Sequence, residues 1–171
     1  MGHGRRSTIA GGAPGQTGGS PLKAEQVLRR YRRGERNFKG ARLEGIDLAG
    51  ADLQTIRLNG ASLRKANLRG ANLCKANLRG ANLYGADLRG ARLHKADLHA
   101  ANLDLADLRE ADLSKSQLNR VHLNEADLRG ADLKGAKLKH ADLTAAHVTG
   151  EQLLQVKSLT GAILPDGKKE S

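Results

Sequence analysis

The sequence predicts an all-β solenoid, on the basis of a five-residue period, a monotonous apolar composition and frequent glycines at one position of the period. Leucine occupies residue 43 and every fifth residue through residue 143, which makes 21 in succession; Phe38 begins the series, and Val148 and Leu153 extend it. The 171 residues include no Trp, two Tyr and one Phe, whereas a globular core of this size usually buries several large aromatic rings. The composition therefore favours many small repeated units.

Each repeat has the pattern Ala-(Asp/Asn)-Leu-x-x. Ala holds the first position in 18 of 22 repeats, and the exceptions are Ile46, Ile56, Ser116 and Val121. Asp or Asn holds the second position in 14 of the 22. A helix would rotate successive leucines by about 140°, and a strand would turn them to opposite faces. Neither element buries them all on one side, so the chain must turn within every repeat.

The last two residues of each repeat are predicted to form a corner. Gly holds the final position in 11 of 23 repeats, as at Gly70 and Gly150. That position is the third of a four-residue turn beginning at Leu, and a type II turn needs a positive φ there, which Gly adopts without steric cost. We expect corners without Gly, such as those ending at Lys75, Lys95 and Lys115, to use a different turn. Four corners of roughly 90° would close a coil of about 20 residues.

The two ends of the chain differ from the repeats. Residues 1–19 are Gly-rich and contain too little apolar surface to offset the entropy of ordering. Ser20-Pro21 is a helix-start signal and Gly34 a stop signal. We divide the chain into a disordered leader at 1–19, an N-terminal cap helix at 20–37, the solenoid at 38–150, and a C-terminal cap and tail at 151–171.

Three observations concern the compartment. The paired Arg5-Arg6 is not followed by the apolar segment of an export signal. Cys74 is the only cysteine, which excludes an internal disulfide and suits a reducing compartment. No apolar run approaches the roughly 20 residues of a membrane helix. We therefore expect a cytoplasmic protein without a membrane span.

The repeats resemble the consensus of the pentapeptide-repeat proteins, most closely in the stretch Ala66-Asn67-Leu68-Arg69-Gly70-Ala71-Asn72-Leu73-Cys74-Lys75-Ala76-Asn77-Leu78. The resemblance implies a right-handed quadrilateral parallel β-helix of about 23 repeats. The segment from Pro21 to Phe38 resembles the helix that precedes such repeats, especially in proteins from photosynthetic bacteria. Residues 151–167 resemble the family's C-terminal cap, which we expect to be short and helical.

Residues 20 apart should stack on one face, about 4.8 Å from each other. One ladder would then contain Arg69, Arg89, Arg109 and Arg129, another Lys75, Lys95 and Lys115, and a third Asp87, Asp107 and Asp127. We expect the aspartates to relieve the repulsion between the arginines. The ladders are either a self-compensated solvated surface, which we favour, or a basic stripe for an acidic partner.

The repeats from Lys115 to Leu123 fit the consensus least well. They place a polar Ser116 and a larger Val121 at successive inward positions and have no Gly corner. This segment is either a local bulge or a contact site, unless it reflects ordinary drift within a repeat array.

We expect no catalytic residues, cofactor or metal. Cys74 and His94 fall on one face in adjacent coils, where a thiol and an imidazole could act as nucleophile and base. We expect both on an open convex surface, without a pocket or an orienting third group, and without further metal ligands nearby. The sequence therefore predicts a protein that is not an enzyme.

Three functions remain open. The leading hypothesis is a non-catalytic structural scaffold or protein–protein interaction module with an unidentified protein partner. The resemblance also brings in a topoisomerase-binding DNA mimic of the quinolone-resistance type, but mimicry needs an acidic rod and the net charge here is +11. The third is binding of nucleic acid or an anionic surface through residues 1–40, which have a net charge of +7. We do not favour nucleic acid, because aromatic residues do not alternate with the basic ones. We expect a monomer, with a dimer as the alternative, because both ends carry cap-like segments.

Overall fold

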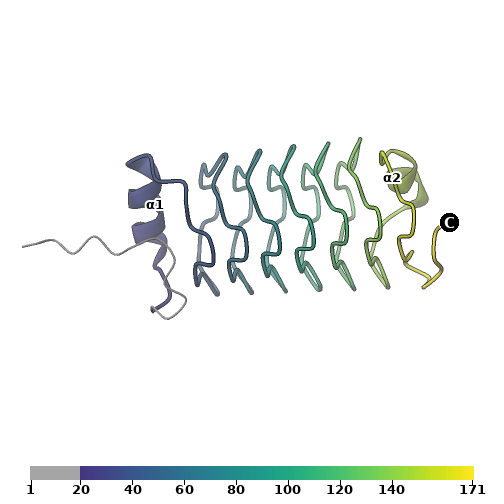
Figure 1. The fold of residues 1–171 in the computed structure, drawn as a ribbon, viewed down its shortest axis with the longest axis horizontal. Coiled ribbons are helices and arrows are strands. Elements are labelled where there is room, and N and C mark those ends of the chain that lie inside the picture. Colours follow the sequence, from purple (N-terminus) through teal and green to yellow (C-terminus); the bar gives the residue numbers. More distant parts are fainter. Residues whose placement is uncertain (1–19) are drawn as a thin grey trace, which may run out of the picture.

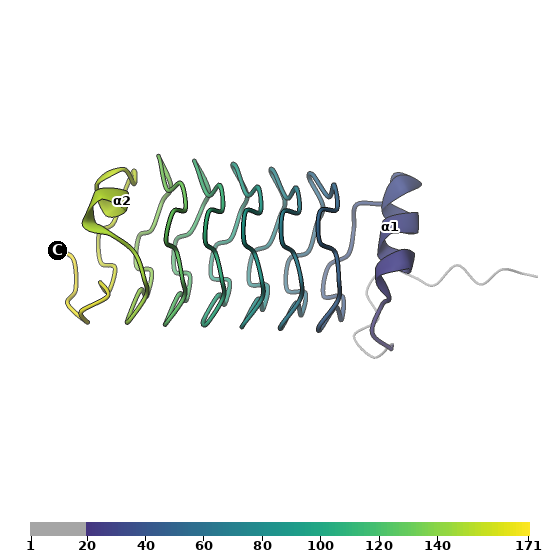
Figure 2. The same ribbon diagram turned by 180° about the vertical axis from the view of Figure 1, so that it is seen from behind.

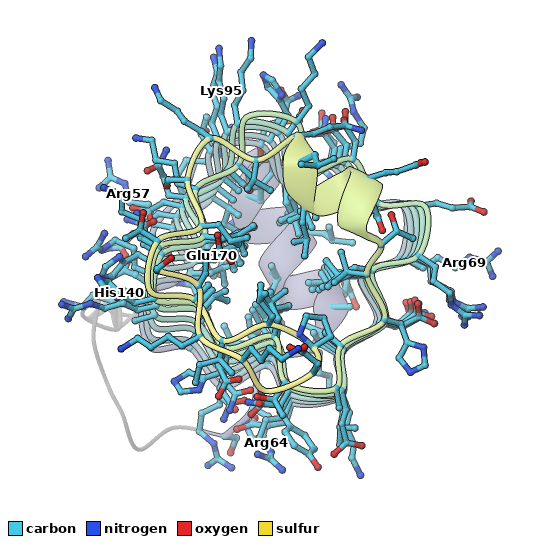
Figure 3. All side chains as sticks on the ribbon, turned by 90° about the vertical axis from the view of Figure 1, so that its right-hand side faces the viewer. Arg57, Arg64, Arg69, Lys95, His140 and Glu170 are labelled. Carbon is cyan, nitrogen blue, oxygen red and sulfur yellow. The ribbon has the colours of Figure 1, made fainter. Side chains whose placement is uncertain are left out.

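The computed structural model describes residues 20–171, so the leader expected at residues 1–19 lies outside the described part of the chain. The described residues form a rod of stacked coils, with helix α1 (Ala24–Arg32) across one end and helix α2 (Gly150–Leu154) near the other (Figures 1 and 2). Seen along the axis of the rod, the coils superpose as a four-sided outline (Figure 3). Neither helix has the length and apolar character that would let it cross a membrane.

The coils stack in parallel with a register of 20 residues. Bridges join the residue before each leucine to its equivalent in the next coil, from Asn37↔Arg57 to Asp127↔His147. Each side of a coil contributes one bridging residue and no longer strand in these repeats, because the chain turns again within two residues of the leucine. The architecture is therefore a parallel β-helix with very short sides.

All five backbone N–H groups of the repeat at residues 66–70 have acceptors. The amides of the second, third and fifth residues donate to carbonyls of neighbouring coils, each at 2.8 Å. The first amide closes the preceding corner at 3.0 Å. The fourth, from Arg69, donates to Oδ1 of Asn67 at 3.2 Å. The frequent Asp or Asn at the second position therefore satisfies the one amide that the backbone cannot.

The corners share a positive φ at the final residue of the repeat. Every final residue of a repeat from 40 to 145 has a positive φ, whether or not it is Gly. The expectation of a different turn at corners without Gly is wrong, because Lys75, Lys95 and Lys115 have φ of 58°, 58° and 57°. The amide of the final residue donates to a carbonyl of the adjacent coil, and the amide of the following residue donates to the leucine carbonyl. Because both hydrogen bonds need this corner, the positive φ is imposed on any residue type. A side chain in this region costs roughly 1–2 kcal/mol.

The core is one continuous column. The leucines from 43 to 143 are at most 2% exposed, and the Ala position beside them is buried from residue 61 onward. Burial of one such leucine contributes about 1.5–3 kcal/mol relative to exposure. The column therefore offsets the cost of the strained corners.

The segment from Lys115 to Leu123 contains no bulge. Gln117 and His122 keep the 20-residue register. Ser116 is fully buried, and its hydroxyl donates to the carbonyl of Leu113 at 2.6 Å. Val121 is 1% exposed. A satisfied hydroxyl and a slightly larger apolar residue are therefore accommodated without a change of backbone path.

Helix α1 begins three residues later than Pro21, where the sequence suggested its start. The amide of Leu22 donates to the carbonyl of Arg42 at 3.0 Å, which ties the preceding segment to the first coil before the helix begins. The side chain of Gln26 accepts from the amide of Lys23 at 2.8 Å. Val27 is fully buried against the end of the core, and Gly34 adopts φ of 90° just beyond the helix.

Helix α2 interrupts the repeat pattern. It begins at Gly150 and contains Leu153, so the assignment of Gly150 to a corner and of Leu153 to the leucine series is wrong. Thr149 and Gln152 cap it reciprocally: the threonine hydroxyl accepts from the Gln152 amide at 3.2 Å, and the Gln152 side chain accepts from the Thr149 amide at 2.9 Å. This capping box favours the helix over a further corner.

Beyond α2 the chain rejoins the stack one residue out of register. Ser158 and Ile163 pair with residues 21 positions earlier, and Ile163 also pairs antiparallel with Lys169. Gly161, with φ of 71°, lies beneath His140, whose imidazole ring occupies the space that an added Cβ would need. The end of the chain is therefore fitted closely to the last coil.

These two kinds of glycine predict different mutational costs. Gly70 has φ of 64° and nothing within 4 Å of an added Cβ, so Gly70→Ala should cost roughly 1–2 kcal/mol through backbone strain alone. Gly161→Ala should cost more, because the His140 ring must also move. Urea denaturation of both variants measures the difference. Equal costs, or a Gly161→Ala cost unaffected by a second His140→Ala change, would contradict this account.

Candidate functional site

The candidate site is the charged surface of the rod, and we number the four sides of a coil in chain order. The first side is centred on Phe38 and its equivalents, the second on Leu43, the third on Leu48 and the fourth on Leu53. The residues before and after each central residue are exposed or half-buried, except for Cys74, and so are the corner residues. Figure 3 shows Arg69, of the third side, across the outline from Arg57, of the first.

The third side carries the predicted arginine ladder, and three of its arginines are paired. Arg89, Arg109 and Arg129 each donate through Nε and Nη2 to the aspartate two residues earlier. Arg89 and Arg109 also lie 3.5 and 3.7 Å from Oδ2 of the aspartate in the next coil. The arginines and aspartates therefore alternate along this side, as expected from the sequence.

This pairing lowers the pKa values of the aspartates. The Arg129 hydrogen bond lowers the pKa of Asp127 to about 2. Equivalent hydrogen bonds lower the pKa of Asp87 and Asp107, and Arg69 adds a weaker attraction to Asp87. Because these side chains remain partly in water, the pairs contribute modestly to stability. The third side is consistent with a self-compensated surface.

The predicted lysine ladder lies in a different electrostatic setting. Lys75, Lys95 and Lys115 are exposed at the corner where the fourth side meets the first, and Figure 3 shows Lys95 pointing away from the rod. These three lysines have no carboxylate within ion-pair distance among the described residues. They border further cations on the first side.

We define the basic face as the outward residues of the first side together with this lysine corner. Its cations are Lys39, Arg57, Lys75, Arg79, Lys95, Lys115, Arg120, Lys137 and Lys139. All but Lys137 are exposed. Its single carboxylate is Asp97, which lies 3.3 Å from Arg79 and forms the one ion pair found on this face in residues 38–150.

The net positive charge of the coils is concentrated on the basic face. The basic face carries nine cations and one anion, whereas the rest of residues 38–150 carries nine cations and twelve anions. A search of the sequence for identical residues in ladders does not detect this imbalance. The cations of the first side mix Lys and Arg at several positions of the repeat, so only a sum of charges per side would have found them.

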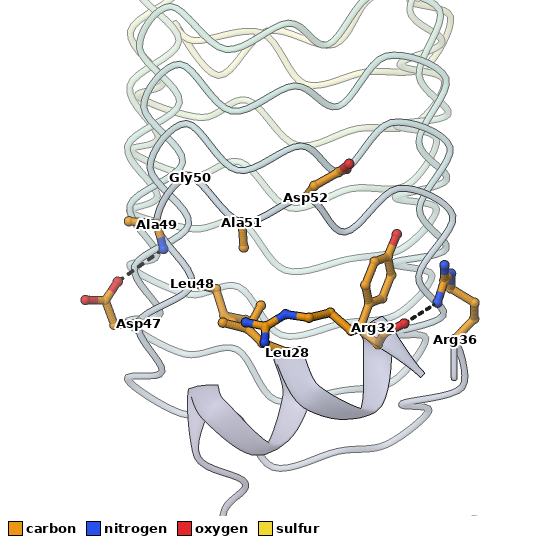
Figure 4. Close-up of a pocket in the computed structure, with 10 residues that line it drawn as sticks. Leu28, Arg32, Arg36, Asp47, Leu48, Ala49, Gly50, Ala51 and Asp52 are labelled. Atoms are coloured by element: carbon orange, nitrogen blue, oxygen red, sulfur yellow. Dashed lines mark hydrogen bonds between the residues drawn. The ribbon is translucent and has the colours of Figure 1, made fainter. Parts of the chain in front are cut away.

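A groove of about 640 Å³ lies between α1 and the first coils (Figure 4). Two of the residues that line it, Tyr31 and Arg36, have internal hydrogen-bond partners. The hydroxyl of Tyr31 donates to the carbonyl of Gln54 at 2.8 Å. Arg36 donates to the carbonyl of Tyr31 at 2.7 Å and stacks on its ring, 3.7 Å from the centroid. The groove is therefore best explained as the seam that holds the cap helix in place.

The Cys74–His94 pair differs from expectation in two respects. Cys74 is buried, with 9% of its surface exposed, and does not lie on an open surface. His94 does have an orienting neighbour, because its Nδ1 lies 2.7 Å from Oγ of Ser114, which donates to Asp112. Burial nevertheless leaves the thiol little access to a substrate. In residues 20–171 no group of three His, Cys, Asp or Glu side chains could hold a metal ion.

The third side predicts a specific pH dependence. The pKa of Asp127 is lower in the folded state than its ordinary value of 3.8. Its pairing therefore stabilises the protein at pH values above 3.8, and this stabilisation is lost as the pH falls toward about 2. A variant with Asp87, Asp107 and Asp127 changed to Asn keeps the oxygen that accepts the arginine amide but loses the charge. Its free energy of unfolding should fall less than that of the wild type between pH 5 and pH 2, as measured by urea denaturation. Parallel pH profiles would contradict the assignment.

Comparisons with known proteins identify the family of this architecture. The family model "Pentapeptide repeats" matches in eight copies, at residues 37–73, 56–94, 66–104 and 106–144. A search of curated proteins found no match. A solved pentapeptide repeat protein from the Arabidopsis thaliana thylakoid lumen is 31% identical, with 74% of this chain and 86% of that chain covered and a TM-score of 0.33.

Two further solved structures are similar. Rfr23, a pentapeptide repeat protein from the cyanobacterium Cyanothece 51142, is 28% identical over 63% of this chain and 92% of its own, with a TM-score of 0.42. HetL, a pentapeptide repeat protein involved in heterocyst differentiation regulation from the cyanobacterium Nostoc sp. strain PCC 7120, is 27% identical over 87% of this chain and 100% of its own, with a TM-score of 0.30. The chain belongs to the pentapeptide-repeat family.

Proposed function

We propose that this protein is a non-catalytic interaction scaffold and that the basic face is its docking surface. The observation that carries the proposal is the uneven distribution of charge. Nine cations and one anion share the basic face, while the remainder of the coils has a slight excess of anions. Unpaired cations that crowd on one side repel one another, and an anionic partner would relieve that repulsion.

The backbone supports a role in binding. Most of its amides are hydrogen-bonded to backbone carbonyls, so the outward Lys and Arg side chains are presented on a surface whose shape does not depend on them. Because each coil repeats the same geometry, the cations lie in rows spaced by about 4.8 Å. A partner would meet a preorganised surface and the cost of ordering on binding would be small.

A topoisomerase-binding DNA mimic receives less support. Mimicry of a duplex needs carboxylates free to replace phosphates. On the third side, Asp87, Asp107 and Asp127 are each paired with arginine. Five expectations stay predictions: the right-handed sense of the β-helix, the number of its repeats, the division of the chain into four segments, the monomeric state and the cytoplasmic location.

The proposal is tested by recovery of partners from a lysate of the source organism. The test variant changes Lys75, Lys95 and Lys115 to Gln, and the matched control changes Arg89, Arg109 and Arg129 to Gln, so both lose three positive charges. We expect the partners of the wild type to be lost by the test variant and kept by the control, with both variants folded by circular dichroism. Loss in the control alone would move the docking surface to the third side.

A further inference from the structure

The basic face extends along most of the rod. Its cations run from Lys39 in the first coil to Lys139 in the sixth, a distance of about 24 Å at 4.8 Å per coil. The lysine corner forms one edge of this strip, and residues such as Arg57 and Arg79 lie within it. An elongated strip of cations, of which Arg79 alone forms an ion pair in residues 38–150, fits an elongated polyanion better than a compact anion.

The surface chemistry distinguishes among polyanions. Interfaces with proteins are enriched in aromatic residues and depleted of Lys, and they depend on buried apolar anchors. The exposed large apolar residues in the described chain are Leu105, on the second side, and Leu154, in α2. Neither belongs to the basic face. The face therefore lacks an anchor for a protein partner.

The same absence bears on membranes and single strands. A surface that binds a bilayer usually combines basic residues with apolar side chains that enter the headgroup region. A surface for single-stranded nucleic acid stacks bases on aromatic rings. Tyr84 is the aromatic residue beyond the first coil, and it lies on the second side. The guanidinium carbon of Arg64 lies over its ring, 4.6 Å from the ring centroid. The basic face therefore lacks the apolar side chains that favour binding to a bilayer and the aromatic rings that favour binding to a single strand.

Binding to duplex nucleic acid requires cationic side chains and no aromatic or apolar anchor, and the basic face provides such cations. The phosphate backbone is recognised by Lys and Arg without stacking, and B-form DNA carries one negative charge per roughly 1.7 Å of its axis. The lack of aromatic residues, which disfavours nucleic acid at the level of the sequence, excludes stacking on single strands but not phosphate contacts. We infer that the basic face binds the phosphate backbone of duplex nucleic acid without reading its sequence. This inference rests on the proposed function, because it names the partner of the same surface.

The test is a binding titration of the purified full chain against a fluorescent 20-base-pair DNA duplex at 50 to 200 mM salt. We expect the logarithm of affinity to fall linearly with the logarithm of salt concentration. The variant with Lys75, Lys95 and Lys115 changed to Gln should bind at least about tenfold more weakly at 50 mM salt. Its slope should be shallower by about one unit for each phosphate that the variant no longer neutralises. The control with Arg89, Arg109 and Arg129 changed to Gln should bind like the wild type.

Four results would overturn the inference. Equal losses in the two variants would mean that binding follows net charge and not the basic face. Tighter binding to a single strand of the same sequence, or binding to vesicles containing phosphatidylserine but not to the duplex, would assign the face to another polyanion. No binding to the duplex at 50 mM salt would also reject it. If lysate partners were still lost by the lysine variant, the proposed docking surface would stand while the inference failed.

Discussion

The described structure depends on a chain that turns within every five residues while the amides of a repeat such as residues 66–70 all find acceptors. Three of the five N–H groups are satisfied by neighbouring coils, and one closes the corner. The remaining amide depends on a side chain, as Asn67 shows for Arg69. Where that side chain is absent, another coil can supply the acceptor: with His122 at the second position, Oδ1 of Asp104 accepts from the Asn124 amide at 2.8 Å. The backbone therefore explains why Asp and Asn are frequent at the second position.

This backbone separates stability from surface chemistry. Inward positions are fixed by the leucine and alanine column, and corners are fixed in φ whatever residue occupies them. Apart from the Asp or Asn that accepts a backbone amide, the outward positions have no comparable constraint, so each side of the rod can acquire its own charge. On the third side cations and anions alternate and compensate one another. On the first side they do not, and that difference is the basis for assigning a function to the rod.

Much of the architecture could be predicted from the sequence because the period of five is incompatible with a helix or a single strand. The helix boundaries could not be predicted in the same way. The start of α1 depends on a hydrogen bond between Leu22 and Arg42, which are far apart in sequence, and the start of α2 depends on the choice between a capping box and a further corner. The turn at Lys75 could not be predicted because local propensity favours Gly there, whereas the stacking of coils imposes a positive φ on lysine.

The candidate site was predictable only in part. The ladder of Arg89, Arg109 and Arg129 is evident from identical residues 20 apart, and its pairing with aspartates follows from their spacing. The basic face requires the four-sided register first and a sum of charges second, because its members are not identical. The partner of His94 could be found by the same rule, since Ser114 lies 20 residues further along the chain.

Amide hydrogen exchange tests the backbone account most directly. In the variant Asn67→Ala, we expect the amide of Arg69 to exchange faster than in the wild type, because it loses its side-chain acceptor. The amides of Leu68 and Gly70, which donate to the next coil, should keep their protection. If the Arg69 amide exchanged at the wild-type rate, or if the whole coil lost protection, the Asp or Asn of each repeat would not have the specific role assigned to it.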